Sequence, residues 1–254
     1  MRLFRRLFRL ARLIRHILAG IVQAAIQLPR TPPPRTDAEW TTVRNWHSKA
    51  LRILGVDAHI HGTPVSGPVL FVSNHISWID ISALLTVVDA GFIGKRELAS
   101  WPVLGFLISR GGTIYIERGG RDAAARTAAE MARRLQRGER VAVFPEGTTT
   151  RGGDMRRFHP RLFEAAREAG VPIQPVAIRY DNPAAPFVDD DPFVAHLWRI
   201  LGEPRIGVDI TLLPPIDAHE QDRRSLARAS EDRIGAIVRE RPAAPRPARE
   251  TADG

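Results

Sequence analysis

Cysteine is absent from the 254 residues of this sequence, which excludes disulfide bonds, thiolate catalysis and metal sites built on thiolate ligands. The chain also has no Gly-x-Ser-x-Gly elbow, the turn that presents a nucleophilic serine in one large class of hydrolases. No pattern recurs at a spacing of about 20 to 50 residues, so the chain is not a repeat protein. The sequence therefore offers neither a cysteine thiolate nor the serine of a Gly-x-Ser-x-Gly elbow as a nucleophile.

Acidic residues are missing from one part of the chain. Residues 1–35 contain eight arginines and no aspartate or glutamate, whereas the whole chain has a formal charge of +9. The remaining 219 residues therefore carry a net charge of only about +1. A nucleic-acid-binding domain usually carries its positive charge on the folded body, so we expect no nucleic-acid partner. The apolar and charged fractions, 44% and 26%, are those of a folded globular protein with one substantial core.

The arginines of the N-terminal segment recur with the period of an α-helix. At 100° per residue, residues 2–30 form an amphipathic helix, which Pro29 and the proline run at 32–34 end. One face is basic and the other largely apolar: the first holds Arg2, Arg5, Arg6, Arg9, Arg12 and His16, and the second holds Phe4, Leu7, Phe8, Leu10, Ala11, Ile14, Ile17 and Leu18. We therefore divide the chain into a membrane-binding helix with its linker (1–35), one folded domain (36–240) and a Pro/Ala/Arg tail expected to be disordered (241–254).

Three interpretations of the N-terminal helix are open. The uncharged run from Ile17 to Leu28 is shorter than the about 20 apolar residues of a spanning helix and holds two glutamines, although a short or tilted span remains an alternative. A signal peptide would place its charges before its apolar core, and Arg5-Arg6 offers only a weak twin-arginine signal. We favour a helix that lies in the membrane interface, with its arginines toward anionic headgroups.

Downstream of this segment, two kinds of apolar run alternate. Short runs rich in β-branched residues predict strands at 56–61, 69–72, 90–94, 113–117, 141–144, 171–180 and 206–213. Segments with helical spacing predict helices at 36–53, 81–88, 101–108, 121–137, 160–169 and 221–240, with a shorter helix within 181–204. This alternation predicts a single α/β domain.

The segment from Val69 to Asp80 is the strongest candidate for chemistry. It predicts a buried strand, a loop with His75, and a helix whose first turn holds Asp80. Ligand sites of α/β proteins lie at the carboxyl ends of strands, so His75 and Asp80 are a candidate catalytic pair. Because helix positions five apart differ by about 140°, the two side chains meet only if the chain bends before the helix. The alternative is a polar His75 and an Asp80 that caps the helix, since Ser77 and Asp80 have capping-box spacing.

Other predicted strand ends carry groups suited to an anion. Arg118 follows a strand beside two glycines, and residues 145–153 form a turn rich in glycine and hydroxyl side chains, whose main-chain donors suit a phosphate. Glu146 lies in this turn, where we expect it to hold an arginine or a hydroxyl group in place. No metal site is expected, because suitable partners at ligand spacing are missing for the candidates His59, His61 and Asp189 to Asp191.

Four segments together resemble the motifs of the glycerolipid acyltransferase family, of the lysophosphatidic-acid-acyltransferase type. They are, in order, Asn74-His75 with Asp80; Lys95, Glu97-Leu98 and Ile114 to Arg118; Phe144-Pro145-Glu146-Gly147-Thr148; and Val171 to Val176. The resemblance covers about residues 60–180, and the order and spacing of the segments match the family. It implies a mixed, mostly parallel sheet flanked by helices.

The resemblance implies transfer of an acyl group from a thioester, either acyl-CoA or acyl carrier protein, to the hydroxyl of a membrane lyso-lipid. His75 would act as general base and Asp80 would orient its imidazole, with no cofactor or metal. The expected acceptor is 1-acyl-sn-glycerol-3-phosphate, giving phosphatidic acid at the cytoplasmic face of the inner membrane, where the protein would be peripheral or monotopic. Polar and charged residues would bind the acceptor, namely Lys95, Arg118, Glu146, Gly147, Thr148 and Arg151.

One residue departs from the family pattern. The family often has arginine directly after the Phe-Pro-Glu-Gly-Thr run, where this chain has Thr149, and Arg151 is then a candidate to replace it. The departure keeps other acceptors open, such as a lyso-ornithine lipid. Two further alternatives are a membrane-bound thioesterase, in which His75 activates water, and a non-enzymatic membrane scaffold, which the presence of both His75 and Asp80 disfavours.

Overall fold

The structure is a computed structural model that describes residues 1–27, 35–95, 104–110, 113–116, 123–188, 191–219 and 221–240. For Lys95 it describes the main chain only. Several predictions lie outside these residues, and they concern Pro29 and the prolines at 32–34, Glu97 and Leu98, Arg118, Asp189 and Asp190, and the tail at 241–254.

Seven strands in the described part of the chain form one sheet, in the order β1-β7-β6-β2-β5-β3-β4. Neighbouring strands are parallel except for β6 and β7, so the expected mixed, mostly parallel sheet is confirmed. The predicted strands are all present, with ends that differ by no more than two residues. They are β1 (Val56–His61), β2 (Leu70–Ser73), β3 (Gly91–Lys95), β4 (Ile114–Ile116), β5 (Val141–Val143), β6 (Ile173–Tyr180) and β7 (Ile206–Leu212).

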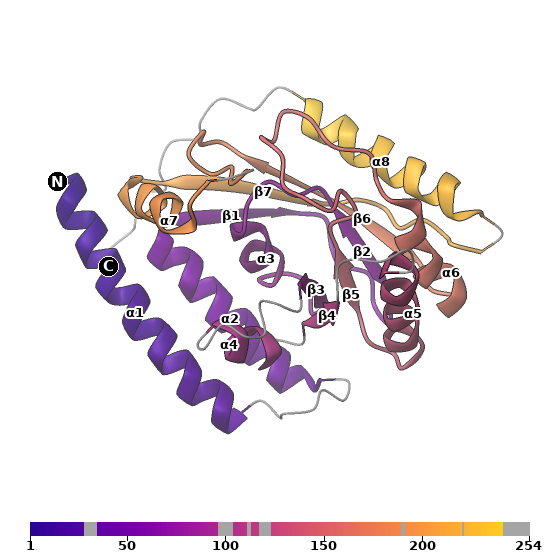
Figure 1. Cartoon of the computed structure of the whole chain (residues 1–254), viewed down its shortest axis with the longest axis horizontal. Coiled ribbons are helices and arrows are strands. Elements are labelled where there is room, and N and C mark those ends of the chain that lie inside the picture. Colours follow the sequence, from indigo (N-terminus) through magenta and orange to yellow (C-terminus); the bar gives the residue numbers. More distant parts are fainter. Residues whose placement is uncertain are drawn as a thin grey trace.

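Helices cover both faces of this sheet (Figure 1). The predicted helix at 81–88 lies instead at 79–84, because the chain tightens into i→i+3 turns at Thr86 and Val87. The predicted helix at 160–169 begins with a 3-10 turn, η2 (Pro160–Phe163). The α-helices of the described residues are α1 (Arg2–Gln27), α2 (Asp37–Leu54), α3 (Ile79–Leu84), α4 (Leu104–Arg110), α5 (Ala123–Gln136), α6 (Glu164–Ala169), α7 (Phe193–Gly202) and α8 (Arg223–Arg239).

Alternation along β2 divides the core into two layers. Phe71 packs with residues of α2 and α3 on one face, whereas Leu70 and Val72 pack with residues of α5, α6 and α8 on the other. Successive strand side chains point to opposite faces, and a central strand is covered on both. This explains why the run from Val69 to Val72 contains no polar residue.

The second helix has clear signals at both ends. The Thr36 hydroxyl accepts from the main-chain N–H of Glu39, and the Glu39 carboxylate accepts from the N–H of Thr36, which completes a capping box. Gly55 ends α2 with a φ of 78°, in the left-handed region that favours glycine. Val56 then starts β1, so these end signals fix the point where the helix leads into the sheet.

The N-terminal helix α1 packs on the body through its basic face. The Arg5 guanidinium donates to the carbonyl of Gly202 at 3.1 Å. The Arg9 guanidinium donates to the carbonyls of Glu203, at 2.6 Å, and Pro204, at 3.1 Å. These carbonyls lie at the C-terminal end of α7, where a helix has unpaired acceptors and a partial negative charge. The arginines of α1 therefore stabilise the end of α7.

The outward face of α1 is apolar. Its exposed large hydrophobic side chains, which we call the apolar stripe, are Leu3, Phe4, Leu7, Phe8, Ile14, Leu18, Val22 and Ile26. Arg15 is exposed among them. The expectation that the arginines face lipid headgroups is therefore wrong for Arg5, Arg6 and Arg9, of which Arg6 lies over the ring of Trp198. An amphipathic pattern shows that a helix has two faces, but the acceptors at the end of α7 decide which face meets the protein. Within the described residues, no helix has both the length and the apolar character to cross a bilayer.

Candidate active site

The carboxyl ends of four neighbouring strands meet at one edge of the sheet. Strands β6, β2, β5 and β3 are adjacent and parallel, so their carboxyl ends point toward the same edge, and β6 extends four residues beyond the residue that pairs with the end of β2. His75 follows β2, Glu146 follows β5, Lys95 ends β3 and Tyr180 ends β6. The topology thus gathers residues that are far apart in the sequence.

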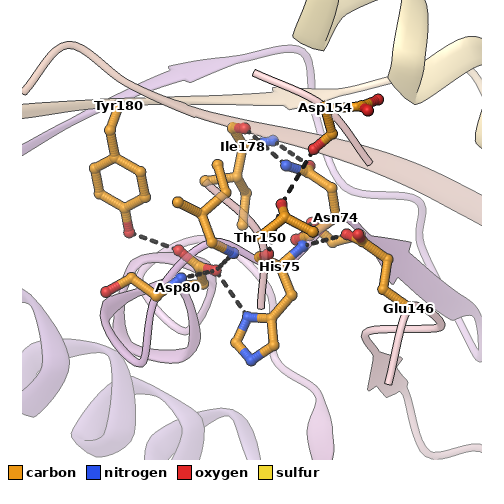
Figure 2. Close-up of polar contacts among 11 residues, drawn as sticks. Asn74, His75, Asp80, Glu146, Thr150, Asp154, Ile178 and Tyr180 are labelled. Atoms are coloured by element: carbon orange, nitrogen blue, oxygen red, sulfur yellow. Dashed lines mark hydrogen bonds and ion pairs between the residues drawn. The ribbon is translucent and has the colours of Figure 1, made fainter. Parts of the chain in front are cut away.

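His75 and Asp80 form the hydrogen-bonded pair that the sequence predicts (Figure 2). His75 Nδ1 lies 2.8 Å from Asp80 Oδ2. The required bend is present, because His75 lies in the loop after β2 and α3 begins only at Ile79. Only one of the two hydrogen bonds of the predicted capping box is present. Asp80 accepts from the main-chain N–H of Ser77 at 2.9 Å, but the Ser77 hydroxyl has no hydrogen-bond partner among the described residues. Asp80 therefore orders the loop and His75.

Four donors point at the Asp80 carboxylate, which is fully buried. Oδ2 accepts from His75 and from the main-chain N–H groups of Ile76, at 2.6 Å, and Ser77, at 2.9 Å. Oδ1 accepts from the Tyr180 hydroxyl at 2.6 Å (Figure 2). A buried carboxylate needs such donors to offset its lost hydration. Since Asp80 only accepts, the proton of neutral His75 is assigned to Nδ1, which leaves the lone pair of Nε2 available.

An aromatic ring covers one face of the His75 imidazole. The Phe144 ring stacks on it, with centroids 3.9 Å apart and planes 8° apart. The His75 side chain is nevertheless 18% exposed, so the imidazole is held in place and still reaches the surface. Phe144 begins the Phe-Pro-Glu-Gly-Thr run, which gives this motif a direct contact with His75.

The loop after β5 holds the main chain of His75 on both sides. Glu146 Oε1 accepts from the His75 N–H at 2.8 Å (Figure 2), and the Thr150 N–H donates to the His75 carbonyl at 2.8 Å. Glu146 Oε2 accepts from the main-chain N–H of Arg156 at 2.7 Å. Glu146 therefore holds an arginine, as expected, but through the main chain of Arg156, and its second partner is the main chain of His75 and not a hydroxyl. Burial raises the pKa of Glu146, against the two N–H donors, which lower it.

The other predicted binding residues of this loop lie closer to the surface. Gly147 is exposed and has a φ of 74°, which favours glycine and lets the loop turn sharply. Thr148 is half-buried. Arg151 is exposed, and its guanidinium has no hydrogen bond or ion pair with any residue that the structure describes. Lys95 ends β3, which lies two strands from the β2 strand of His75.

Two histidines of β1 take part in surface pairs away from this edge. His59 Nε2 lies 3.2 Å from an Arg205 nitrogen, and His61 Nε2 lies 3.3 Å from Asp209 Oδ1. Across the described ranges, no group of three or more histidine, cysteine, aspartate or glutamate side chains has an arrangement that could hold a metal ion. His59 and His61 are thus strand side chains, as the sequence predicts.

The geometry gives His75 the orientation that a general base requires. The Asp80 bond fixes the orientation of His75 through Nδ1. No serine or threonine hydroxyl of the described residues is hydrogen-bonded to this imidazole. A histidine held in this way can accept a proton from a hydroxyl or a water molecule that does not belong to the described residues.

Comparisons with known proteins identify the family. Residues 56–179 match the family model described as Acyltransferase. The chain is 37% identical over 238 residues to the lyso-ornithine lipid O-acyltransferase of Pseudomonas aeruginosa, covering 91% of this chain and 92% of that protein. It is 35% identical over 176 residues to the 1-acyl-sn-glycerol-3-phosphate acyltransferase of Neisseria gonorrhoeae, covering 67% and 69%. The chain belongs to the acyltransferase family and is a lysolipid O-acyltransferase.

The fold agrees with a solved structure. The crystal structure of the 1-acyl-sn-glycerophosphate acyltransferase PlsC from Thermotoga maritima aligns with a TM-score of 0.69 and 21% sequence identity, covering 94% of this chain and 97% of that one. The expected fold class is therefore confirmed.

Two further residues complete the site, of which the sequence motifs include Asn74 but not Tyr180. The Tyr180 hydroxyl donates to the Asp80 carboxylate. The Asn74 side chain exchanges two hydrogen bonds with the main chain of Ile178, at 3.0 and 2.8 Å, which ties the loop after β2 to β6. The available signal was that Tyr180 ends an apolar strand. The position of Tyr180 near His75 follows from this only when the order of the strands in the sheet is known.

Proposed function

We propose that this chain transfers an acyl group from an acyl thioester to the hydroxyl of a lyso-ornithine lipid. The main support is the Pseudomonas aeruginosa relative, which aligns over nearly the whole of both chains, whereas the Neisseria gonorrhoeae relative aligns over about two thirds. Thr149 gives independent support, because it replaces the arginine that often follows this run in enzymes of the lysophosphatidic-acid type.

The reaction moves one proton and exchanges one bond. His75 Nε2 accepts the proton of the lipid hydroxyl while the hydroxyl oxygen attacks the carbonyl carbon of the thioester. The tetrahedral intermediate then expels the thiolate, which takes the proton from the imidazolium, so an ester and a free thiol are formed. Asp80 stabilises the imidazolium between these two steps. The acceptor itself is the nucleophile, so no cysteine or serine is needed.

The charge of the acceptor headgroup is what separates the two lysolipids. A phosphate monoester carries about −1.5 to −2 charges at pH 7, whereas an ornithine head carries one carboxylate and one ammonium group. A loop with a neutral Thr149 suits the less anionic head, and the exposed Arg151 is our candidate partner for its carboxylate. Glu146 acts instead on the main chain of His75. Further proposed headgroup contacts, taken from the family motifs, are Lys95, Arg118, Gly147 and Thr148.

The lipid acceptor requires a membrane-bound enzyme, and we propose that the apolar stripe of α1 binds the cytoplasmic face of the inner membrane. Phe4 and Phe8 in this stripe are exposed and stack on each other. Flotation with neutral phosphatidylcholine vesicles tests the idea: Phe4→Glu with Phe8→Glu should abolish binding. Ile60→Glu, an exposed apolar position on β1, is the matched control and should leave binding intact. Binding that needs anionic lipid and survives the double substitution would contradict the proposal.

An acceptor screen tests the proposed reaction. Purified protein receives a labelled long-chain acyl-CoA or the same acyl group on acyl carrier protein, with lyso-ornithine lipid, lysophosphatidic acid or no acceptor. We expect label in ornithine lipid, lost with His75→Ala. Label only in phosphatidic acid would overturn the choice of acceptor, and label only in free fatty acid would indicate a thioesterase. Transfer that persists with His75→Ala would refute the general-base role.

A further inference from the structure

Tyr180 supplies the hydrogen bond to the second oxygen of the Asp80 carboxylate. Its hydroxyl lies 2.6 Å from Oδ1, whereas His75, Ile76 and Ser77 all donate to Oδ2. We propose that Tyr180 is a positioning residue of the reaction, which fixes the rotation of this carboxylate so that Oδ2 stays aligned with His75 Nδ1. The inference rests on the proposed general-base role of His75.

Tyr180 is itself held on both sides of β6. Asp181, the next residue, donates its N–H to the Gly207 carbonyl at 3.1 Å and accepts the Gly207 N–H at 2.6 Å, which fixes the end of β6 against β7. On the other side, the Asn74 side chain is paired with the main chain of Ile178, which fixes β6 against the loop of His75. The phenol therefore reaches Asp80 from a rigid base, as a positioning group must.

The role is that of a permanent donor. Burial, followed by the charge of Asp80, raises the pKa of Tyr180 well above its ordinary value, so the hydroxyl keeps its proton while the enzyme works. A donor at Oδ1 also stabilises part of the negative charge of the carboxylate, which leaves a weaker attraction between Asp80 and an imidazolium at His75. Removal of the Tyr180 hydroxyl therefore frees the Asp80 carboxylate to rotate. The same removal strengthens the attraction between Asp80 and an imidazolium at His75.

Tyr180→Phe removes this one hydroxyl and tests the proposal. We expect kcat to fall about 10- to 100-fold, the loss typical of one hydrogen bond to a charged group, with KM changed less than about twofold. The acidic limb of the pH–rate profile should shift to higher pH. The matched control is Ser230→Ala, which removes a fully buried hydroxyl bonded to the Leu226 carbonyl in α8, on the other face of the sheet. It should leave the kinetics and the pH profile unchanged.

An NMR titration separates this proposal from the proposed function. With ¹⁵N-labelled histidine, and His75→Ala for assignment, the imidazole of His75 should titrate at higher pH in Tyr180→Phe than in the wild type, whichever acceptor the enzyme uses. If Tyr180→Phe does not fold, 3-fluorotyrosine at both tyrosines strengthens the donor and should move the titration to lower pH. A wild-type kcat together with an unchanged titration, or an unchanged titration in the fluorinated protein, would overturn the role of Tyr180.

Discussion

Asp80→Asn tests the site most directly, because it removes one charge and keeps the shape of the side chain. The amide oxygen still accepts from the N–H groups of Ile76 and Ser77, whereas the amide NH₂ donates to the Tyr180 oxygen, and the Tyr180 hydroxyl proton loses its acceptor. Three charge-assisted hydrogen bonds become neutral ones, at about 0.5–1 kcal/mol each, and the unpaired hydroxyl proton adds about 1–3 kcal/mol, which gives about 2.5–6 kcal/mol in all. The variant should therefore fold with reduced stability.

The expected effect of Asp80→Asn on catalysis is larger. The imidazolium that forms during transfer loses its buried counter-ion, and the same exchange in a Ser-His-Asp triad lowers kcat about 10⁴-fold. We expect kcat to fall about 10³- to 10⁴-fold, which corresponds to about 4–5.5 kcal/mol of activation free energy. KM should change little, because the Asp80 side chain is fully buried and does not contact the substrate in the proposed mechanism.

Initial rates of acyl transfer at saturating thioester and lysolipid, with thermal unfolding as a check on folding, measure this effect. The double variant with His75→Ala and Asp80→Asn should be no slower than His75→Ala alone, because the two residues act as one unit. A folded Asp80→Asn enzyme whose kcat lies within tenfold of the wild type would refute the reasoning.

Three further predictions concern the acceptor, acid stability and helix packing. Thr149→Arg should raise kcat/KM for lysophosphatidic acid relative to lyso-ornithine lipid about tenfold in a competition assay, and an unchanged ratio would show that this position does not read the headgroup. Burial lowers the pKa of His47 to about 3, so between about pH 6.5 and pH 3 the His47 imidazole is protonated only in the unfolded chain. The free energy of unfolding measured with urea should therefore fall by up to about 2 kcal/mol between pH 7 and pH 5. His47→Asn should lose most of this pH dependence. A Cβ on Gly20 would overlap the Trp46 indole, so Gly20→Val should loosen α1 and speed its tryptic cleavage, whereas Ala19→Val, at an exposed neighbour, should not.

The strands were predictable because β1 alternates between apolar and polar residues and the others are short apolar runs that glycine, proline or polar residues end. Strand β5, for example, is three apolar residues followed two positions later by Pro145. The order of the strands was not predictable from pattern, since the paired strands β2 and β5 are about 70 residues apart in the sequence. The family resemblance supplied the mostly parallel sheet, and the structure supplied the order.

In the candidate site, too, the residues that are close in sequence were predictable and the distant ones were not. His75 and Asp80 were predictable because they lie five residues apart and share one loop. The groups that hold them come from far along the chain: Glu146 lies 71 residues from His75, and Tyr180 lies 100 residues from Asp80. Pattern reading detects a local pair, whereas the hydrogen bonds that position the pair depend on how distant strand ends meet.

The place of Glu146 resolves an apparent conflict in the motif. An acid beside a binding site for an anionic headgroup would repel its ligand if the carboxylate faced it. In this structure the carboxylate is only 4% exposed, and its two oxygens accept the N–H groups of His75 and Arg156. The charge is therefore turned inward, where it fixes the peptide of His75, while Gly147 and Arg151 stay exposed on the same loop. One short motif can thus position the base and still leave an exposed arginine for the headgroup.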